Sequence, residues 1–363
     1  MNQEVPLLSI VVPNRNRSLK IVRKLLVSVL SQLSNRIQLT IVDYGSALDY
    51  QQELAKLVKE FIKVDLILCP TQGQLFHKTR AINIVLRKTT STYFMVLDMD
   101  CICHPDFIDK ALELVALGHP VNFPYGFLSE HESQLNKSFD NYNYDFVGGL
   151  TGTAIFKTVD LLELNGFDEI YHNWGAEDAD MFERLKHKGI TTTHYTDELL
   201  LLHQWHKKEY RNTGSKLPYH STLEQINHGY FQFSGTLKRI KANQSLPWGL
   251  GFDQDQYKKL LEPSFTLELN STQEEVSALC FQLKESSFDG TLLIRVQEHK
   301  HAKSLKTRLK TVLRLKQPQY ISLEDSNRLL LETIILNHRN QPYTYHRSNK
   351  SIRISLFFQS KSA

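Results

Sequence analysis

The sequence has few cysteines and no long apolar stretch, and each shortage excludes a class of protein. Its 363 residues include only four cysteines, and their uneven spacing does not form a disulfide framework. No run approaches the roughly 18 uninterrupted apolar residues that a membrane-spanning helix needs. The N-terminal stretch also lacks a basic segment followed by an apolar run and a cleavage site. We therefore expect no signal peptide and no transmembrane helix, and a cytoplasmic setting.

The composition is that of a globular protein. Hydrophobic residues make up 41% of the chain and aromatic residues 10%. The length allows one large α/β domain and a smaller one. A formal net charge of +4 permits anionic ligands or contact with a membrane surface but requires neither.

Short apolar runs alternate with helical patterns over the first hundred residues. Helices are predicted between the runs. The runs predict four strands, at residues 7–12, 37–46, 64–69 and 92–100. This alternation is typical of an open, mostly parallel sheet with helices on both faces. Because such sheets bind ligands at the carboxyl ends of their strands, the polar residues at those ends are the first candidates for a site.

The pattern changes twice along the rest of the chain. After residue 105 the alternation of strands and helices becomes less regular. There we predict a strand over 146–157, a helix over 159–169 and a strand over 198–206. From about residue 263 the α/β alternation returns, with predicted strands at 264–269, 290–297, 319–323 and 351–359 and helices at 273–286, 301–315 and 325–337. We therefore predict a domain over 1–250, with a nucleotide-binding half (1–105) and an acceptor half (106–250), and a small α/β domain of unknown role over 263–363.

Two acids one residue apart, Asp98 and Asp100, close the fourth predicted strand. Carboxylates are ligands that Mg²⁺ and Mn²⁺ prefer, and a cation between two phosphates neutralises charge on a departing diphosphate. D-x-D alone is a weak motif that also occurs in solvated loops. At the end of the second strand, Asp43 could accept a hydrogen bond from a uracil N–H, and Pro13 with the polar residues after it could form the floor under a base and ribose.

The stretch "NWGAEDADMFERL" (173–185) places Trp174 and Gly175 before three acids, Glu177, Asp178 and Asp180. Acids at a helix N-terminus stabilise the helix by roughly 0.3–1 kcal/mol each, which would explain the acids alone. A Trp face packs well on a pyranose ring, and Gly lets the backbone approach a ligand closely. Helical spacing places Glu177 and Asp178 on different stripes, which favours two separate roles.

Five segments together resemble family 2 glycosyltransferases of the GT-A fold. They are "VVPNRNR", "IVDYGS", "KTRAIN", "LDMD" and "GFDEIYHNWGAEDADMFERL". The last segment is similar to the C-terminal galactosyltransferase segment of β-1,4-galactosyltransferases and chondroitin-polymerase-type enzymes. The resemblance covers about residues 7–206 and does not extend to 250–363.

The resemblance implies a role for each matching residue. Asp178 would be the general base, and Trp174, Gly175 and Glu177 would hold the acceptor sugar. Residues that would bind the nucleotide-sugar are Pro13, Asn14, Arg15, Arg17, Asp43, Arg80, Asn83 and Asp98. Asp100 and His203 would bind Mn²⁺ or Mg²⁺, with Asp98 and His206 as alternatives, because "HQWH" offers two histidines that spacing does not separate.

The implied activity is inverting, metal-dependent transfer of a hexose or N-acetylhexosamine. The donor would be a UDP-sugar and the acceptor a hydroxyl of a glycan or lipid-linked glycan, in bacterial surface polysaccharide synthesis. A nucleotidyltransferase would need a glycine-rich phosphate loop, which "VVPNRNR" does not provide. A non-catalytic glycan- or nucleotide-binding protein on the same fold is the remaining alternative.

Two further segments could suggest other ligands. Cys101, Cys103 and His104 lie together, but no second Cys/His cluster lies at zinc-finger spacing, so we expect buried cysteines. Residues 300–316 form a basic amphipathic pattern that could dock on the inner face of an anionic membrane. A solvated helix is the interpretation that the sequence favours. The segment lacks the interleaved aromatics typical of nucleic-acid binding, so no nucleic-acid partner is expected.

Overall fold

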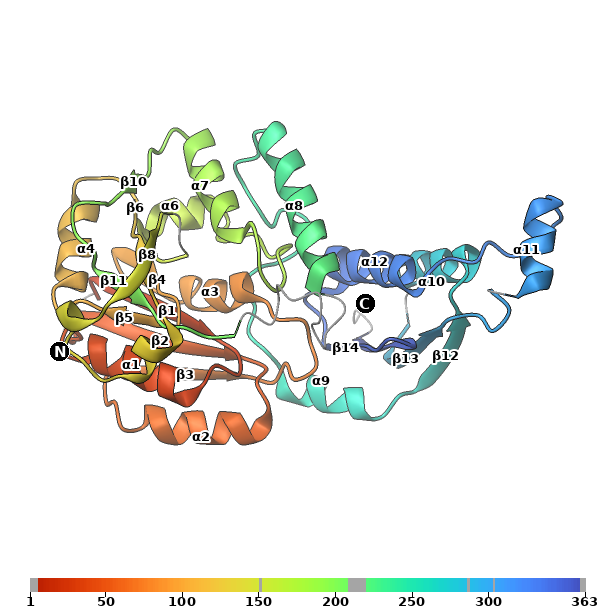
Figure 1. Cartoon of the computed structure of the whole chain (residues 1–363), viewed down its shortest axis with the longest axis horizontal. Helices are drawn as coiled ribbons and strands as arrows, with labels where there is room; N and C mark the ends of the chain where they lie inside the picture. Colours follow the sequence, from red (N-terminus) through yellow and green to blue (C-terminus); the bar gives the residue numbers. More distant parts are fainter. Residues whose placement is uncertain (1–5, 150–151, 208–219, 286–287, 303, 360–363) are drawn as a thin grey trace. The chain divides into compact units, whose positions relative to one another are not determined.

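The computed structural model describes residues 6–149, 152–207, 220–285, 288–302 and 304–359 (Figure 1). The chain divides into two compact units. The first consists of Met1–Cys69, Phe76–Lys208 and Asn227–Gly251. The second consists of Pro70–Leu75, Glu209–Ile226 and Phe252–Ala363. The long helix α8 (His220–Thr236) contributes residues to both units.

The first unit is built on a seven-stranded sheet with the order β10-β6-β9-β4-β1-β2-β3. Its strands are β1 (Leu8–Asn14), β2 (Ile37–Tyr44), β3 (Val64–Cys69), β4 (Tyr93–Val96), β6 (Val121–Asn122), β9 (Ala154–Lys157) and β10 (Thr193–His194). The strands β4, β1, β2 and β3 are parallel, whereas β9 runs antiparallel to both β4 and β6. This arrangement confirms the predicted mostly parallel sheet.

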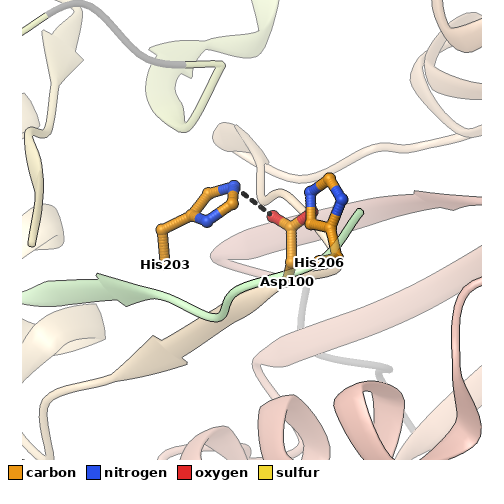
Figure 2. A group of neighbouring side chains, drawn as sticks. All are labelled: Asp100, His203 and His206. Carbon is orange, nitrogen blue, oxygen red and sulfur yellow. Dashed lines mark ion pairs between the residues drawn. The ribbon is translucent and has the colours of Figure 1, made fainter. Parts of the chain in front are cut away.

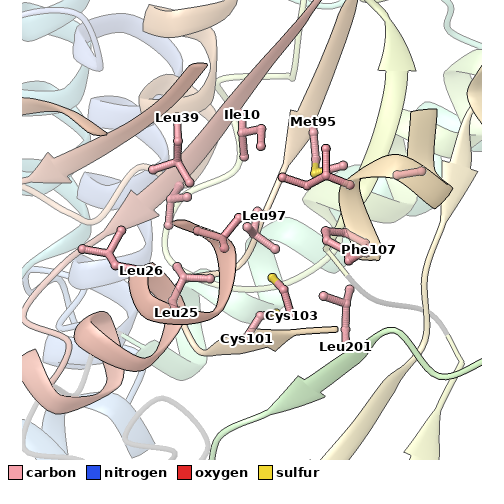
Figure 3. Packing of buried hydrophobic residues seen from close by; sticks show 14 of the residues in the cluster. Ile10, Leu25, Leu26, Leu39, Met95, Leu97, Cys101, Cys103, Phe107 and Leu201 are labelled. Atoms are coloured by element: carbon pink, nitrogen blue, oxygen red, sulfur yellow. The ribbon is translucent and has the colours of Figure 1, made fainter. Parts of the chain in front are cut away.

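Helices connect and flank these strands. They are α1 (Leu19–Leu30), α2 (Leu48–Val58), α3 (Lys78–Leu86), α4 (Phe107–Ala116), α5 (Glu130–Gln134), α6 (Thr158–Glu163) and α7 (Glu177–His187), with a 3-10 turn at Phe139–Asn141. In α1 the residues Val22, Leu25, Leu26 and Val29 are buried, at the spacing of one helix face. They join a core that also takes side chains from β1, β2 and β4 and from Cys101 and Cys103 (Figure 3).

A second, four-stranded sheet explains why two predicted strands are interrupted. It has the order β5-β11-β7-β8 and consists of β5 (Cys101–Cys103), β7 (Tyr125–Leu128), β8 (Tyr144–Gly148) and β11 (Leu201–His203). The predicted strand 92–100 therefore ends at Val96, and the chain resumes at Cys101 in the other sheet. The predicted strand 146–157 is also wrong as a single element, because its two ends belong to β8 and β9 in different sheets.

The change of sheet leaves Asp98 and Asp100 in the turn between β4 and β5. The backbone N–H of Asp98 donates to Thr153 Oγ1 at 3.1 Å instead of joining a strand ladder. A two-residue periodicity cannot reveal this turn, because apolar side chains continue through it. The short β11 likewise replaces the longer predicted strand 198–206.

The second unit is a small α/β structure, with a four-stranded sheet in the order β12-β13-β15-β14. Its strands are β12 (Phe265–Asn270), β13 (Gly290–Gln297), β14 (Tyr343–Arg347) and β15 (Ser351–Phe358). Its helices are α9 (Gln254–Lys258), α10 (Gln273–Glu285), α11 (Leu305–Val312) and α12 (Leu323–Thr333), with a 3-10 turn at Lys259–Leu261 and a π-helical turn at Ile334–His338. The predicted strand 319–323 is wrong: it contributes one isolated bridge, between Thr272 and Tyr320. None of the helices in the described parts of either unit is long and apolar enough to cross a membrane.

Candidate active site

Asp100, His203 and His206 form a cluster suited to a metal ion (Figure 2). Antiparallel pairing of β11 with β5 sets His203 opposite Cys101, beside Asp100. The Asp100 carboxylate lies 3.4 Å from His203 Nε2 and 3.2 Å from His206 Nε2. One ligand atom from each of the three lies within 4.8 Å of the others. The two histidines that spacing did not separate therefore both reach the cluster.

The charges around this cluster suit cation binding. Burial would raise the pKa of Asp100, but the two histidines and Arg17 outweigh it and hold that pKa well below its usual range. Burial lowers the pKa of His203, which favours the neutral imidazole that a metal needs as ligand. Arg17 Nη2 lies 3.1 Å from Asp100 Oδ2. A nitrogen and oxygen donor set of this kind fits a divalent transition metal.

Lys78, the first residue of α3, lies at the centre of three carboxylates. Its Nζ is 3.3 Å from Asp98 Oδ1, 3.2 Å from Glu177 Oε1 and 3.3 Å from Asp178 Oδ2. Its side chain is only 14% exposed. Because one ammonium group balances three acids, at least part of this negative charge remains uncompensated.

The pKa of Asp178 reflects this crowding. Burial raises it to about 7, helped by the nearby Glu177 and Asp98 and opposed by Lys78. A carboxylate with a pKa near neutrality can both accept a proton and hold it, which is the property required of a general base.

The expectation that Glu177 and Asp178 diverge is wrong. Helical spacing places them on separate stripes, but both lie in the first turn of α7 and both side chains reach Lys78. The longer Glu177 side chain also turns back, and its Oε2 accepts a hydrogen bond from the Gly175 N–H at 3.0 Å. Two residues on different stripes of a helix can therefore still contact the same partner at the start of the helix.

The backbone before α7 is bent by three residues with positive φ. They are Asn173 (φ 64°), Gly175 (φ 114°) and Ala176 (φ 68°). A positive φ is costly for alanine, and such residues persist where the surroundings hold them in place, often at functional sites. Here they turn the chain so that the first residues of α7 face Lys78. The backbone carbonyl of Trp174 accepts a hydrogen bond from Asn227 Nδ2 at 3.2 Å.

The third acid of this stretch, Asp180, has a structural role. It is 2% exposed and lies 2.7 Å from Arg184 Nε and 2.9 Å from Arg239 Nη2. Tyr171 also donates its hydroxyl to Asp180 at 3.1 Å. The explanation of these acids as helix-stabilising groups therefore suits Asp180, whereas Asp178 belongs to the Lys78 cluster.

Asp98 and Asp178 flank the same glycine. A Cβ atom added to Gly152 would lie 2.8 Å from Asp98 Oδ2, 3.0 Å from Asp178 Oδ2 and 2.7 Å from Lys78 Nζ. Asp98 also accepts from the Tyr125 hydroxyl at 2.9 Å. The acid of the D-x-D motif and the acid of α7 are therefore neighbours in space, although 80 residues separate them in the sequence.

The carboxyl ends of β1 and β2 also lie side by side, because Asn14 pairs with Asp43 in the parallel register. Pro13 and Asn14 end β1, and Arg15 follows, half-buried. The Asp43 carboxylate is buried and accepts from Asn14, Gln51 and twice from Ser46. These four bonds occupy the acceptor positions of a carboxylate. A uracil N–H could reach Asp43 only by replacing one of them, so the geometry favours a role in orienting Asn14 and Ser46.

Arg80 and Asn83 are buried in α3, with exposures of 1% and 0%. Asn83 Nδ2 donates to the Phe167 carbonyl at 2.8 Å and to Glu169 Oε1 at 3.0 Å. Arg80 Nη2 donates to the Leu250 carbonyl at 3.4 Å. In this structure both side chains therefore anchor loops of the same unit, whereas the resemblance implied a lining of the nucleotide-sugar pocket.

Sequence reasoning missed Lys78, Tyr125 and Thr153 as members of the site. Lys78 belongs to the quoted "KTRAIN" segment, so the segment was found but the residue was not. Tyr125 donates to Asp98, and its hydroxyl lies 2.5 Å from Thr153 Oγ1. No local pattern distinguishes such residues, because they reach the site from separate places in the chain: the start of α3, the start of β7 and the residue before β9.

Residues 9–175 match the family model described as Glycosyl transferase family 2. The match spans β1, the D-x-D turn and the bent stretch up to Gly175, and it ends before Glu177 and Asp178. Together with the sheet architecture it supports a glycosyltransferase of the GT-A fold. The match does not confirm the likeness of residues 166–185 to a galactosyltransferase-type segment.

The solved structures that resemble this chain do so only weakly. The mannosyltransferase PcManGT from Pyrobaculum calidifontis, in complex with GDP-Man and Mn²⁺, is 15% identical with a TM-score of 0.42, over 65% of this chain and 72% of that one. TarS (residues 1–349) from S. aureus, in complex with UDP, is 14% identical with a TM-score of 0.47, over 70% of this chain and 69% of that one. Similarities of this size identify neither donor nor acceptor.

Proposed function

We propose that this protein is an inverting, metal-dependent glycosyltransferase. It moves a hexose or N-acetylhexosamine from a UDP-sugar to a hydroxyl of a glycan or lipid-linked glycan, in the assembly of a bacterial surface polysaccharide. The observation that carries the proposal is the contact of Lys78 Nζ with both Asp98 and Asp178. It brings the candidate base to the acid of the D-x-D turn.

Asp178 acts as the general base. Its carboxylate accepts the proton of the acceptor hydroxyl while that oxygen forms a bond to the anomeric carbon of the donor. The bond from that carbon to the diphosphate breaks, and the electron pair leaves with UDP. Because attack and departure take place on opposite faces of the carbon, the configuration inverts.

The leaving diphosphate lies at the Asp100 side of the site. Two imidazoles beside one carboxylate favour Mn²⁺ over Mg²⁺, which prefers oxygen ligands alone. A cation bound by Asp100, His203 and His206 would supply the positive charge that stabilises the departing diphosphate. Arg17, 3.1 Å from Asp100, adds a fixed positive charge at the same place.

The acceptor lies on the α7 side. Trp174 would pack against a pyranose ring, while the backbone at Gly175 approaches it closely. Glu177 is 5% exposed and already bonded to Lys78 and Gly175, so it fixes the position of the base more than it binds sugar. At the sheet edge, Pro13, Asn14 and Arg15 line the nucleotide side, oriented through Asp43.

Calorimetry of UDP binding with and without Mn²⁺ tests this proposal. The wild type should bind UDP in a metal-dependent way, and Asp100→Ala should abolish the dependence. Asp106→Ala is the matched control, because Asp106 lies between β5 and α4 with its side chain 80% exposed. If UDP binds neither with nor without Mn²⁺, the UDP-sugar assignment is wrong, and a glycan-binding protein becomes the better explanation.

A further inference from the structure

Helix α11 of the second unit carries an apolar stripe on its exposed side. Leu305, Leu309 and Val312 are 82%, 61% and 77% exposed, and Leu313, just past the helix, is 57% exposed. Their spacing of four, seven and eight residues from Leu305 places them on one face. Single exposed apolar side chains are ordinary, but four on one stripe indicate an interaction surface.

On the opposite side of α11, Thr307 is held by the turn that precedes the helix. Thr307 is 8% exposed, and its hydroxyl donates to the His301 carbonyl at 2.7 Å. Its N–H donates to Ser304 Oγ at 3.1 Å. At about 100° per residue, Thr307 lies about 200° around the helix from Leu305. The side chain that is buried in α11 is therefore a small polar one, and the leucines are exposed.

Positive charge borders the apolar stripe on both sides. On the same helical projection Lys306 lies about 60° beyond Leu309, and Arg308 lies about 60° before Leu305. The sequence from 299 to 323 contains no Asp or Glu. The described cations of this stretch are Lys300, Lys306, Arg308, Lys310, Arg314 and Lys316.

We propose that α11 docks on the surface of an anionic phospholipid bilayer. Leu305, Leu309 and Val312 enter the boundary between headgroups and acyl chains, and the flanking cations contact the phosphates. This goes beyond the proposed transferase activity and does not depend on its donor. It also changes the interpretation that the sequence favoured, because a merely solvated basic helix does not account for an apolar stripe turned outward.

Charge complementarity selects a lipid surface over two other occupants. A second copy of the chain would bring two cationic helices together and would be opposed by like-charge repulsion. A nucleic acid would satisfy the cations but would leave the leucines in water, and residues 300–316 contain no Phe, Trp or Tyr on which bases could stack. An anionic bilayer satisfies both the charges and the apolar stripe.

The test is co-sedimentation of the full chain with vesicles, in phosphatidylcholine alone and with about 30% phosphatidylglycerol. We expect binding to the anionic vesicles that weakens with salt, and little binding to phosphatidylcholine. Leu309→Gln should weaken anionic binding by about tenfold. Lys306→Gln with Lys310→Gln should weaken it by about 25-fold, at about fivefold for each cation.

Matched controls carry the same changes elsewhere. Leu117→Gln removes another exposed leucine, 77% exposed, and Lys56→Gln with Lys59→Gln removes two exposed lysines of α2 and its cap. Both controls should bind vesicles as the wild type does. The thermal unfolding of the two controls and the two α11 variants should be unchanged. Three outcomes would overturn the proposal: no sedimentation with anionic vesicles, binding that Leu309→Gln leaves intact, or a dimer in light scattering that Leu309→Gln dissociates. Binding of a short DNA duplex that Leu309→Gln leaves unchanged, without vesicle binding, would assign the cations to nucleic acid instead.

Discussion

Lys78 Nζ lies 3.3 Å from Asp178 Oδ2, in a cluster where three carboxylates share one ammonium group. Lys78 and Asp178 shift each other's pKa in opposite directions. Lys78 lowers the pKa of Asp178 against the larger effect of burial, while the three acids raise the pKa of Lys78 well above its usual value in spite of its burial. Lys78 therefore stays charged at neutral pH while Asp178 titrates.

The transfer rate should rise with pH through about 7. A general base works only in its deprotonated form, and Asp178 has a pKa of about 7. The fraction of active base therefore grows as pH increases and levels off above that value. The profile of kcat/KM for a UDP-sugar across the neutral range measures this. An activity that falls over the same range would exclude Asp178 as the base.

Removing the ammonium group should move that profile to higher pH. In Lys78→Met the charge that lowers the pKa of Asp178 is gone, while burial, Glu177 and Asp98 still raise it. Lys78→Arg keeps the charge and should restore most of the original midpoint. A loss of activity at every pH, with no shift of the midpoint in Lys78→Met, would mean that Lys78 does not set the pKa of Asp178.

Asp178→Asn should abolish transfer and leave the fold and UDP binding intact. Loss of a general base costs about 10²–10⁴-fold in rate. An uncharged amide also relieves repulsion with Glu177 and Asp98, so thermal unfolding should not fall. The rate, the UDP affinity and the melting temperature are measured on one preparation. A variant that keeps the wild-type rate would contradict the assignment.

The neighbouring substitution Asp180→Asn should have the opposite effect, because it should lower the stability of the fold and leave transfer intact. Asp180 is buried between Arg184 and Arg239, and removing one partner of a buried charge network costs about 3–5 kcal/mol of unfolding free energy. Chemical denaturation measures this loss. Residual folded protein should still transfer sugar, because the partners of Asp180 are Arg184, Arg239 and Tyr171 and not the Lys78 cluster. Wild-type stability in Asp180→Asn would show that the network contributes little.

The sequence predicted the sheet and its edge well, because those depend on local patterns. Runs of buried β-branched residues end at Asn14 and Asp43, and parallel pairing then brings the two ends together. The pattern also places Asp98 and Asp100 near the end of a strand, although it does not show that the strand ends at Val96 and that both acids lie in a turn. The second sheet was not predictable in this way, since β5 and β11 have three residues each and pair only through long-range contacts.

The site was predictable as a set of segments but not as a set of contacts. Asp178 was identified from its segment, whereas its partner Lys78 lies 100 residues earlier and has no pattern of its own. The sequence also could not show that Asp43 and Asn83 form hydrogen bonds within the protein, because the same residue type can bind a ligand or another part of the chain.

Both histidines should contribute to metal affinity. His203 and His206 lie 3.4 Å and 3.2 Å from Asp100, on opposite oxygens of its carboxylate. We therefore expect His203→Ala and His206→Ala each to weaken Mn²⁺ binding by at least about tenfold. Titration of the protein with Mn²⁺ by calorimetry measures this without any donor present. His131→Ala, which removes an exposed histidine of α5, is the control and should bind as the wild type does. If His206→Ala alone binds normally, His206 serves to hold Asp100 in place, and the metal rests on Asp100 and His203 with a different third ligand, for which Asp98 is the nearest candidate acid of the same turn.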